Sequence, residues 1–317
     1  MSVTSQPANQ FAAPNDTGGR SSAFRELARD IKLSHSVFAM PFALLAAVMA
    51  RSDDAGWAPW LIKLGLVVVC MVAARTAAML SNRILDRTYD ADNPRTAQRA
   101  LVSGRVAVRD AISALIGSSA LFLVCTAVFG FAFDNWWPLL LSMPVLFWIC
   151  AYPLLKRVTW LCHLYLGTSL AISPLAAAIA IRPESVFEHA SLWLLSGFVL
   201  GWVAGFDVIY ALQDVEVDRQ QSLHSVPSRL GVAAALWISR VLHILCVCVL
   251  ALVCLQDTRF GYPFWLACGL VAAVLIVEHV VIRVDRTAGR IQLAFFTLNG
   301  IISCVVGLVG IIDVTVI

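Results

Sequence analysis

Residues 190–218 read ASLWLLSGFVLGWVAGFDVIYALQDVEVD, an apolar stretch that ends in a group of carboxylates. About 20 consecutive apolar residues are enough for a helix to cross a bilayer, and residues 190–213 meet that length. Inside a bilayer the backbone must satisfy its own hydrogen bonds, which a helix does within one segment. The stretch therefore predicts a membrane-spanning helix that carries Asp207, Asp214 and Asp218 toward one membrane face.

The chain as a whole has the same apolar character. Of its 317 residues 60% are hydrophobic and 14% are charged, whereas an ordinary soluble domain has about 25% charged residues. These figures argue strongly against a soluble globular protein and exclude a disordered one, and a net charge of +3 gives no reason to expect nucleic acid as a partner. Candidate spans lie at about 33–50, 57–80, 108–131, 136–154, 158–181, 190–213, 232–255, 262–282 and 291–312. We predict an all-α polytopic membrane protein with nine transmembrane helices.

The distribution of Lys and Arg sets the orientation of such a bundle. With the N-terminus in the cytoplasm, eighteen of the 23 basic residues fall in cytoplasmic segments and three in outer loops. Tryptophans gather at the opposite interface, as in an aromatic belt: Trp57, Trp60, Trp136, Trp137 and Trp265. We therefore predict a cytoplasmic N-terminus, a disordered polar tail over 1–24, and one nine-helix domain over 25–317 in the cytoplasmic (inner) membrane.

Two polar segments on the predicted cytoplasmic side carry acidic and amide side chains at helical spacing: Asn82, Asp86 and Asp90 in the first, and Asp207, Asp214 and Asp218 in the second. A helix would put each set on one face. Like charges so close to one another and to a membrane are unfavourable unless a cation neutralises them. Oxygen ligands suit Mg²⁺, which binds one or two carboxylates together with waters and substrate phosphates. The alternative is that these are solvated loop acids balanced by arginines, but two such segments on one side favour a diphosphate held through Mg²⁺.

Four basic residues on the same side are candidates for binding the diphosphate: Arg95, Arg99, Lys156 and Arg157. Guanidinium and ammonium groups are the usual partners of phosphate oxygens. Their alternative role is to anchor the topology as positive-inside residues. By contrast, the nine cysteines lie in apolar runs without any C-x-x-C spacing and are expected to be buried hydrophobes. His163, His243 and His279 are expected to make interhelical hydrogen bonds.

These residues resemble the UbiA superfamily of membrane prenyltransferases. The likeness lies in the two acidic patterns, where Tyr210 and Ala211 follow Asp207, and extends to Tyr-Pro-Leu-Leu-Lys-Arg at 152–157 and Pro-Arg-Thr at 94–96. The resemblance implies Mg²⁺-dependent transfer of a prenyl group from a prenyl diphosphate to an acceptor, often an aromatic ring. Asn82, Asp86 and Asp90 would match the first metal site, and Asp214 and Asp218 the second. Asp207 and Tyr210 would line the pocket, and Lys156 and Arg157 would match its basic pair.

Two positions depart from the family pattern. Arg83 stands where an Asp usually follows the Asn, and Leu223-His224-Ser225 replaces a segment that usually holds a Lys. Both features resemble a subgroup described as 4-hydroxybenzoate polyprenyltransferases, which implies 4-hydroxybenzoate as acceptor and a role in ubiquinone biosynthesis. Some members of this subgroup serve menaquinone instead, with 1,4-dihydroxy-6-naphthoate as acceptor, and haem, chlorophyll or homogentisate prenylation stays open as well.

The chemistry expected of such an enzyme assigns further roles. Aromatic faces can stabilise an allylic cation without attacking it, so Tyr210 and Tyr152 are catalytic candidates. Asp207 and His35 are candidates for the base that removes the ring proton. A polyprenyl tail would lie between helices open to lipid. A secondary transporter is the rival from another class, since acids within membranes mark ion pathways, and a non-catalytic scaffold is a further alternative.

Overall fold

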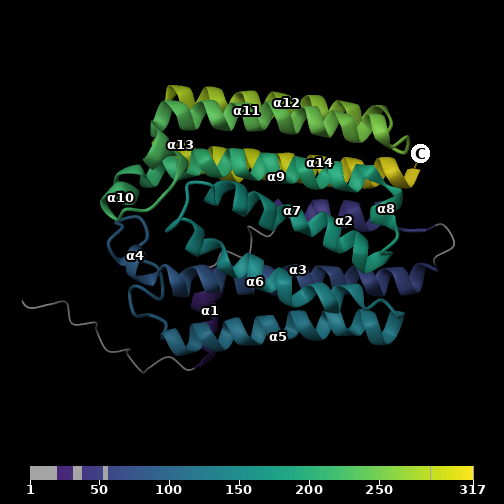
Figure 1. Cartoon of the computed structure of the whole chain (residues 1–317), viewed down its shortest axis with the longest axis horizontal. Helices are drawn as coiled ribbons and strands as arrows, with labels where there is room; N and C mark the ends of the chain where they lie inside the picture. Colours follow the sequence, from purple (N-terminus) through teal and green to yellow (C-terminus); the bar gives the residue numbers. More distant parts are fainter. Residues whose placement is uncertain (1–19, 31–37, 53–55, 286, 317) are drawn as a thin grey trace, which may run out of the picture.

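The computed structural model describes residues 20–30, 38–52, 56–285 and 287–316. Within these residues the chain is helical throughout and contains no strand. Eight helical segments are long and apolar enough to cross a membrane, and they run side by side as one bundle (Figure 1). The long helices are α3 (Trp57–Leu85), α5 (Val108–Phe133), α6 (Trp137–Leu155), α7 (Cys162–Ile181), α9 (Ala190–Tyr210), α11 (Val226–Gln256), α12 (Tyr262–Val284) and α14 (Asn299–Val316).

Short elements connect and extend these helices, and most of them lie at one end of the bundle. They are α1 (Arg20–Asp30), α2 (Met40–Met49), α4 (Arg87–Ala91), α8 (Ser185–Glu188), η2 (Ala211–Asp214), α10 (Val215–Gln220), α13 (Ala288–Gln292) and the π-helical η3 (Leu293–Leu298). In Figure 1, α4, α10 and α13 lie together at the left end, whereas α8 and the C-terminus lie at the right. We refer to the left end as the acidic end, because both acidic segments lie there.

The predicted spans correspond to these helices, with one difference at the start of the chain. The first candidate, 33–50, contains only the 10-residue helix α2 among the described residues, about 15 Å long at 1.5 Å per residue. Residues 31–37, which include the candidate base His35, lie outside the described ranges. Helix α1 begins at Arg20, and residues 1–19 of the expected tail are likewise outside those ranges. The count of nine crossings and the side of the N-terminus therefore stay predictions.

Helix α9 is the centre of the bundle. Its side chains Phe198 and Trp202 are fully buried and pack with Phe42 of α2. Small residues allow the neighbouring helices to approach closely: a Cβ on Gly167 of α7 would meet the Leu200 carbonyl oxygen at 2.6 Å. Close backbone approach through small residues is the usual way in which helices pack in membranes. Since α9 leads directly into the second acidic segment, this packing fixes the start of that segment.

The unusual Arg83 ties helix α1 to helix α3. Its side chain is buried, and its Nε donates to Asp30 Oδ2 at 3.1 Å while one terminal nitrogen donates to Asn82 Oδ1 at 3.0 Å. Leu27 of α1 packs in the same region against Leu80 and Leu101. A guanidinium paired with a carboxylate is tolerated in a buried position because its charge is balanced. Arg83 therefore orients Asn82 and anchors α1 beside the acidic end.

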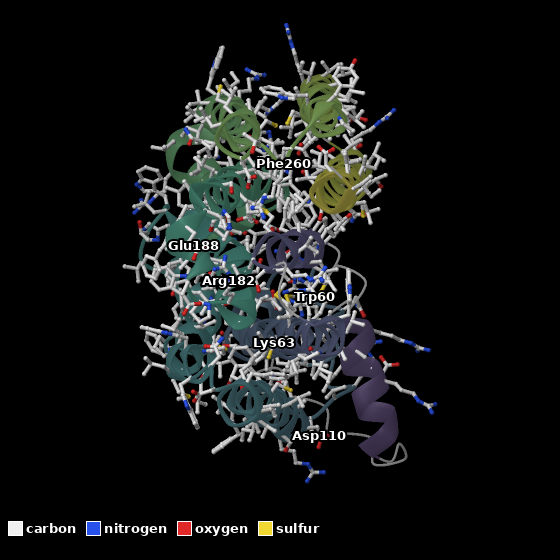
Figure 2. All side chains as sticks on the ribbon, turned by 90° about the vertical axis from the view of Figure 1, so that its right-hand side faces the viewer. Trp60, Lys63, Asp110, Arg182, Glu188 and Phe260 are labelled. Carbon is white, nitrogen blue, oxygen red and sulfur yellow. The ribbon has the colours of Figure 1, made fainter. Side chains whose placement is uncertain are left out.

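Polar contacts also close the opposite end of the bundle, which Figure 2 views along the helices. Arg182 and Glu188 form an ion pair there. The buried Asp313 of α14 accepts the backbone N–H of Gly261 at 2.7 Å and of Phe264 at 3.3 Å. The first N–H groups of a helix have no partner within that helix, so Asp313 caps α12 from a distant part of the chain.

We expect Asp313→Ala to lower the free energy of unfolding by about 1–2 kcal/mol, since it removes the acceptor of a helix N-terminus. Asp313→Asn retains one carbonyl oxygen and should lose less. The thermal unfolding midpoint of the purified protein in detergent measures both effects. Thr315→Ala on the same helix is the matched control, because Thr315 is exposed and bonds only its own helix. Equal midpoints for wild type and Asp313→Ala would contradict the capping role.

Candidate active site

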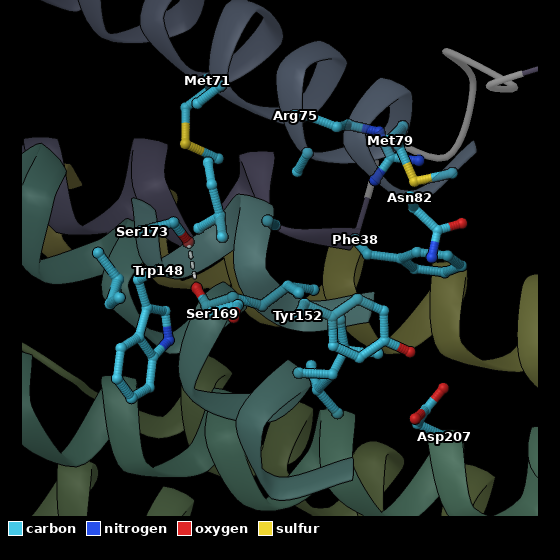
Figure 3. A pocket seen from close by; sticks show the side chains of 18 of the residues that line it. Phe38, Met71, Arg75, Met79, Asn82, Trp148, Tyr152, Ser169, Ser173 and Asp207 are labelled. Carbon is cyan, nitrogen blue, oxygen red and sulfur yellow. Dashed lines mark hydrogen bonds between the residues drawn. The ribbon is translucent and has the colours of Figure 1, made fainter. Parts of the chain in front are cut away.

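A cavity of about 970 Å³ opens at the acidic end and continues between the helices into apolar surroundings. Polar side chains of both acidic segments line its mouth, among them Asn82, Asp90, Asp214 and Asp218. Deeper in the bundle its wall is apolar and comes mainly from α3, α5, α6 and α7. Figure 3 shows part of this wall, with α3 on one side and Asp207 on the other. The cavity can therefore hold a molecule with a charged head and a long apolar tail.

The first acidic segment is interrupted at Asp86, which corrects the expectation of one continuous helical face. Helix α3 ends at Leu85, Asp86 is its C-cap, and Asp90 lies on the short helix α4. Asn82 still donates to Asp86 Oδ2 at 3.2 Å, and Asp86 Oδ1 accepts from Arg157 at 3.2 Å. Asp90 pairs with Arg99 at 2.5 Å. Asn82, Asp90 and Arg99 line the cavity, whereas Asp86 and Arg157 are not among its lining residues.

The second acidic segment likewise runs over three elements instead of one helix: Asp207 on α9, Asp214 on η2 and Asp218 on α10. Arg95 holds both oxygens of Asp214, at 3.0 and 2.6 Å, and Asn93 donates to Asp214 at 3.0 Å. Lys156 Nζ lies 2.7 Å from Asp218 Oδ1. The breaks in the helix turn the acids toward the cavity, where all three are lining residues.

Ion pairs join the segments to one another. Arg95, which follows the first acidic segment, binds Asp214 of the second, and Lys156 from the end of α6 binds Asp218. Gln221 adds a hydrogen bond to the carbonyl oxygen of Tyr89 at 2.9 Å. The four basic residues expected to bind a diphosphate therefore each hold one of the acids expected to bind metal.

The donor set of the cavity mouth suits a hard cation. Its candidate ligands are the oxygens of Asn82, Asp90, Asp214 and Asp218, without sulfur or imidazole. Among the described residues no three metal-binding side chains converge on one point. Mg²⁺ does not require such a cage, because one or two carboxylates complete its shell with waters and substrate phosphates. The residues present thus fit Mg²⁺ that is shared with a diphosphate.

The pairs control ionisation at the cavity mouth. Burial lowers the pKa of Lys156, but the charge of Asp218, its hydrogen bond to Lys156 and the charge of Asp214 together outweigh burial and raise that pKa above its ordinary value. Burial raises the pKa of Asp86, and the hydrogen bond from Arg157 offsets only part of this effect. Lys156 therefore stays cationic, whereas the Asp86 carboxylate is less stable as an anion than one in water.

Asp207 differs from the other acids in its partner. It is 8% exposed, and His163 Nδ1 lies 2.7 Å from its Oδ2. Both residues line the cavity, and the ring of Tyr152 projects into it with the hydroxyl toward Asp207 (Figure 3). The sequence predicted only an interhelical hydrogen bond for His163. The bond exists, but its partner is a site residue 44 positions away, which no local pattern indicates.

Arg75 is a second site residue that the sequence analysis did not single out. It lies on the membrane-spanning helix α3, lines the cavity, and has no hydrogen bond or ion pair with any residue that the structure describes. Figure 3 shows it on the same helix as Asn82, on the side of the cavity opposite Asp207. An ionisable residue inside a membrane span usually serves a function, so its position within span 57–80 was the available signal. Its free guanidinium offers the cavity a site for an anion.

Aromatic rings cover the wall between the mouth and the apolar part. Tyr210 packs against Phe295 with ring centroids 4.2 Å apart, and Phe296 and Phe206 extend the cluster. The π-helical turn η3 carries Phe295 and Phe296 into the cavity wall, and such turns occur frequently at functional sites. Arg95 also donates to the Tyr210 hydroxyl at 3.2 Å. This arrangement places π faces beside the charged mouth, where a developing cation would be stabilised.

Comparison with known proteins agrees with this geometry. The family model described as "UbiA prenyltransferase family" matches residues 39–301. A 4-hydroxybenzoate octaprenyltransferase from Pseudomonas fluorescens (strain SBW25) is 30% identical over 218 residues, which cover 68% of this chain and 69% of that protein. The apo structure of a UbiA homolog from Aeropyrum pernix K1 superposes with a TM-score of 0.77 at 31% identity, covering 89% of this chain and 98% of that one.

A more distant structure shares the fold alone. A UbiA homolog from Archaeoglobus fulgidus, bound to GPP and Mg²⁺, superposes with a TM-score of 0.66 at 19% identity. The match covers 92% of this chain and 100% of that one.

Proposed function

The chain belongs to the UbiA prenyltransferase family, and from this premise we propose that it transfers a polyprenyl group from a polyprenyl diphosphate to 4-hydroxybenzoate, with Mg²⁺, in ubiquinone biosynthesis. The observation that carries the proposal is the cavity, which has paired charges at its mouth, an Arg75 in its wall without a partner among the described residues, and an apolar interior. The named relative supports the acceptor, since it is a 4-hydroxybenzoate octaprenyltransferase.

The donor would bind with its diphosphate at the acidic end and its tail among the apolar helices. Arg95, Arg99 and Lys156 line the mouth and are close enough to the acids to exchange a carboxylate partner for a phosphate oxygen. Asn82, Asp90, Asp214 and Asp218 would hold Mg²⁺, with Asp86 and Arg157 behind them. When bound, Mg²⁺ neutralises the leaving diphosphate. A neighbour of the same fold is bound to GPP and Mg²⁺, which supports a prenyl diphosphate and Mg²⁺ as ligands of this chain.

The reaction would proceed by separating charge inside this cavity. As the carbon–oxygen bond of the donor lengthens, positive charge develops on the allylic group, and the rings of Tyr210 and Tyr152 can stabilise it without forming a bond to it. The apolar wall excludes water, which would otherwise capture the cation. The acceptor ring then attacks through the carbon next to its hydroxyl group, and its ring proton leaves to a base.

Arg75 gives a physical reason to choose a carboxylated acceptor. An unpaired guanidinium in a membrane span is costly unless an anion joins it, and a planar carboxylate matches its fork of donors. The acidic mouth already has cations for the diphosphate, so Arg75 is available to the acceptor. Both 4-hydroxybenzoate and 1,4-dihydroxy-6-naphthoate carry such a group. Either would enter from the cytoplasm, which the acidic end faces in the orientation that the basic residues favour.

The reaction itself can be tested in membranes that contain the protein, with Mg²⁺ and a labelled prenyl diphosphate. We expect prenylated 4-hydroxybenzoate, and we expect EDTA to abolish the product. Parallel incubation with 1,4-dihydroxy-6-naphthoate distinguishes the two acceptors. Product from the naphthoate alone would replace ubiquinone by menaquinone as the pathway, and no product from either acceptor would contradict the proposed function.

We expect Asp86→Ala and Asp214→Ala to reduce activity at limiting Mg²⁺ by about 100-fold or more, because each removes charge that the metal site requires. The measurement is the initial rate as a function of Mg²⁺ concentration. Asp92→Ala is the matched control, since Asp92 is exposed and lies between the two segments without lining the cavity. A wild-type rate in either site variant at limiting Mg²⁺ would refute the metal assignment.

We expect Arg75→Met to raise the KM for 4-hydroxybenzoate by about 10- to 100-fold, because loss of a charge-assisted hydrogen bond weakens binding by about this factor. The KM for the donor should be unchanged. The neutral analogue 4-hydroxybenzamide should be a poor acceptor for the wild type, and Arg75→Met should lose this discrimination. Arg109→Met, at an exposed position, is the control. If the variant still prefers the acid by the wild-type ratio, Arg75 does not bind the carboxylate.

A further inference from the structure

One acid of the cavity, Asp207, pairs with a histidine instead of an arginine or lysine among the described residues. At the acidic end, Asp86, Asp90, Asp214 and Asp218 each pair with an arginine or lysine. Within the described part of the chain, the side chain that hydrogen-bonds Asp207 is His163, at 2.7 Å. The second carboxylate oxygen of Asp207 has no such partner there. The hydrogen bond between His163 and Asp207 therefore sets the orientation of this carboxylate.

The surroundings of His163 fix its tautomer. Its Nε2 accepts the backbone N–H of Val226, the first residue of α11, at 3.2 Å. A nitrogen that accepts a hydrogen bond carries no hydrogen itself. The hydrogen of the neutral ring is then on Nδ1, from which it is donated to Asp207. The histidine is 4% exposed and held between α9 and α11, so it cannot easily turn away.

This geometry orients the Asp207 carboxylate. One oxygen accepts from His163 Nδ1, and the other has no hydrogen-bond partner among the described residues and is available to the cavity that Asp207 lines. Tyr152 points toward it, and Arg75 lies on the opposite side of the same cavity (Figure 3). An acceptor whose carboxylate binds Arg75 would therefore present its other end, which carries the hydroxyl group, toward Asp207.

We propose that His163 and Asp207 act as a pair in which His163 positions Asp207 to accept the ring proton of the acceptor; this assignment rests on the proposed function. The donor carbon–oxygen bond breaks, and its electron pair leaves with the diphosphate. The first prenyl carbon bonds to the ring carbon next to the hydroxyl group. The carbon–hydrogen bond at that ring carbon then breaks, its electron pair restores the aromatic ring, and the proton passes to the free oxygen of Asp207.

His163→Leu tests the positioning role. Because Asp207 would lose its orienting donor, we expect kcat to fall about 100-fold, with the KM values for donor and acceptor within about threefold of wild type. His163→Asn keeps an N–H donor near the position of Nδ1, and we expect it to recover most of that loss. A loss of kcat in His163→Leu that the asparagine does not restore would contradict positioning by this hydrogen bond.

Deuterium at both ring carbons next to the acceptor hydroxyl gives a readout that a merely structural role would not change. In the wild type, proton loss follows carbon–oxygen cleavage, and we expect no isotope effect on kcat. In His163→Leu the weakened base makes proton loss limiting, so a primary isotope effect should emerge. Slow turnover without an isotope effect would overturn the proposal.

His243→Leu is the matched control. His243 is also a buried histidine within the bundle, hydrogen-bonded to His279 at 3.0 Å, and it does not line the cavity. Its replacement should give no isotope effect, whatever it does to the unfolding midpoint. If the wild type prenylates no acceptor, the proposed function fails. If the wild type is active and His163→Leu has the same kcat as the wild type, the His163–Asp207 pair is refuted and the proposed function stands.

Discussion

Charge beside a bilayer is stable only when an opposite charge or a set of hydrogen-bond donors is close, and this constraint organises the acidic end of the protein. Four carboxylates at this end each bind one arginine or lysine. Three of these pairs, Arg95–Asp214, Lys156–Asp218 and Arg157–Asp86, join segments that are distant in the sequence. The ion pairs thus hold the two acidic segments against each other over the mouth of the cavity, while α9 and its apolar neighbours provide the rigid support.

Two charges inside the cavity depart from this pairing, and they lie on opposite walls. Arg75 has no acidic partner among the described residues, and Asp207 pairs with a histidine instead of an arginine or lysine. A transporter would need ionisable groups along a path through the membrane, whereas the described acids of both motifs gather around one cavity mouth. The family match and this concentration of charge favour an enzyme that holds its substrate in place. The cation and the anion across the cavity suit a small aromatic acid with a different polar group at each end.

The sequence predicted the helical bundle well because hydropathy measures the property that a bilayer selects. Hydropathy placed the end of the second span at about residue 80, whereas helix α3 runs to Leu85, because polar residues continue the helix beyond the apolar run. Spacing predicted most of the acids that line the cavity mouth, with Asp86 as the exception, but not the breaks at Asp86 and Ala211, because local helix geometry depends on tertiary packing. Pairs such as Arg95–Asp214 join residues 119 positions apart, and one sequence contains no signal for them. Arg75 could have been recognised from its charge within a span.

The ion pairs of the acidic end also have a thermodynamic consequence for the order of binding. Mg²⁺ alone would displace Arg95 or Lys156 from its carboxylate and leave a cation beside a cation. A diphosphate alone would draw those side chains away and leave carboxylates beside an anion. Together the two ligands exchange partners with the protein and preserve neutrality, so each strengthens the binding of the other, and this coupling is reciprocal. On the proposed function, we therefore expect the site to admit the metal–diphosphate complex as one species and to bind either component by itself poorly.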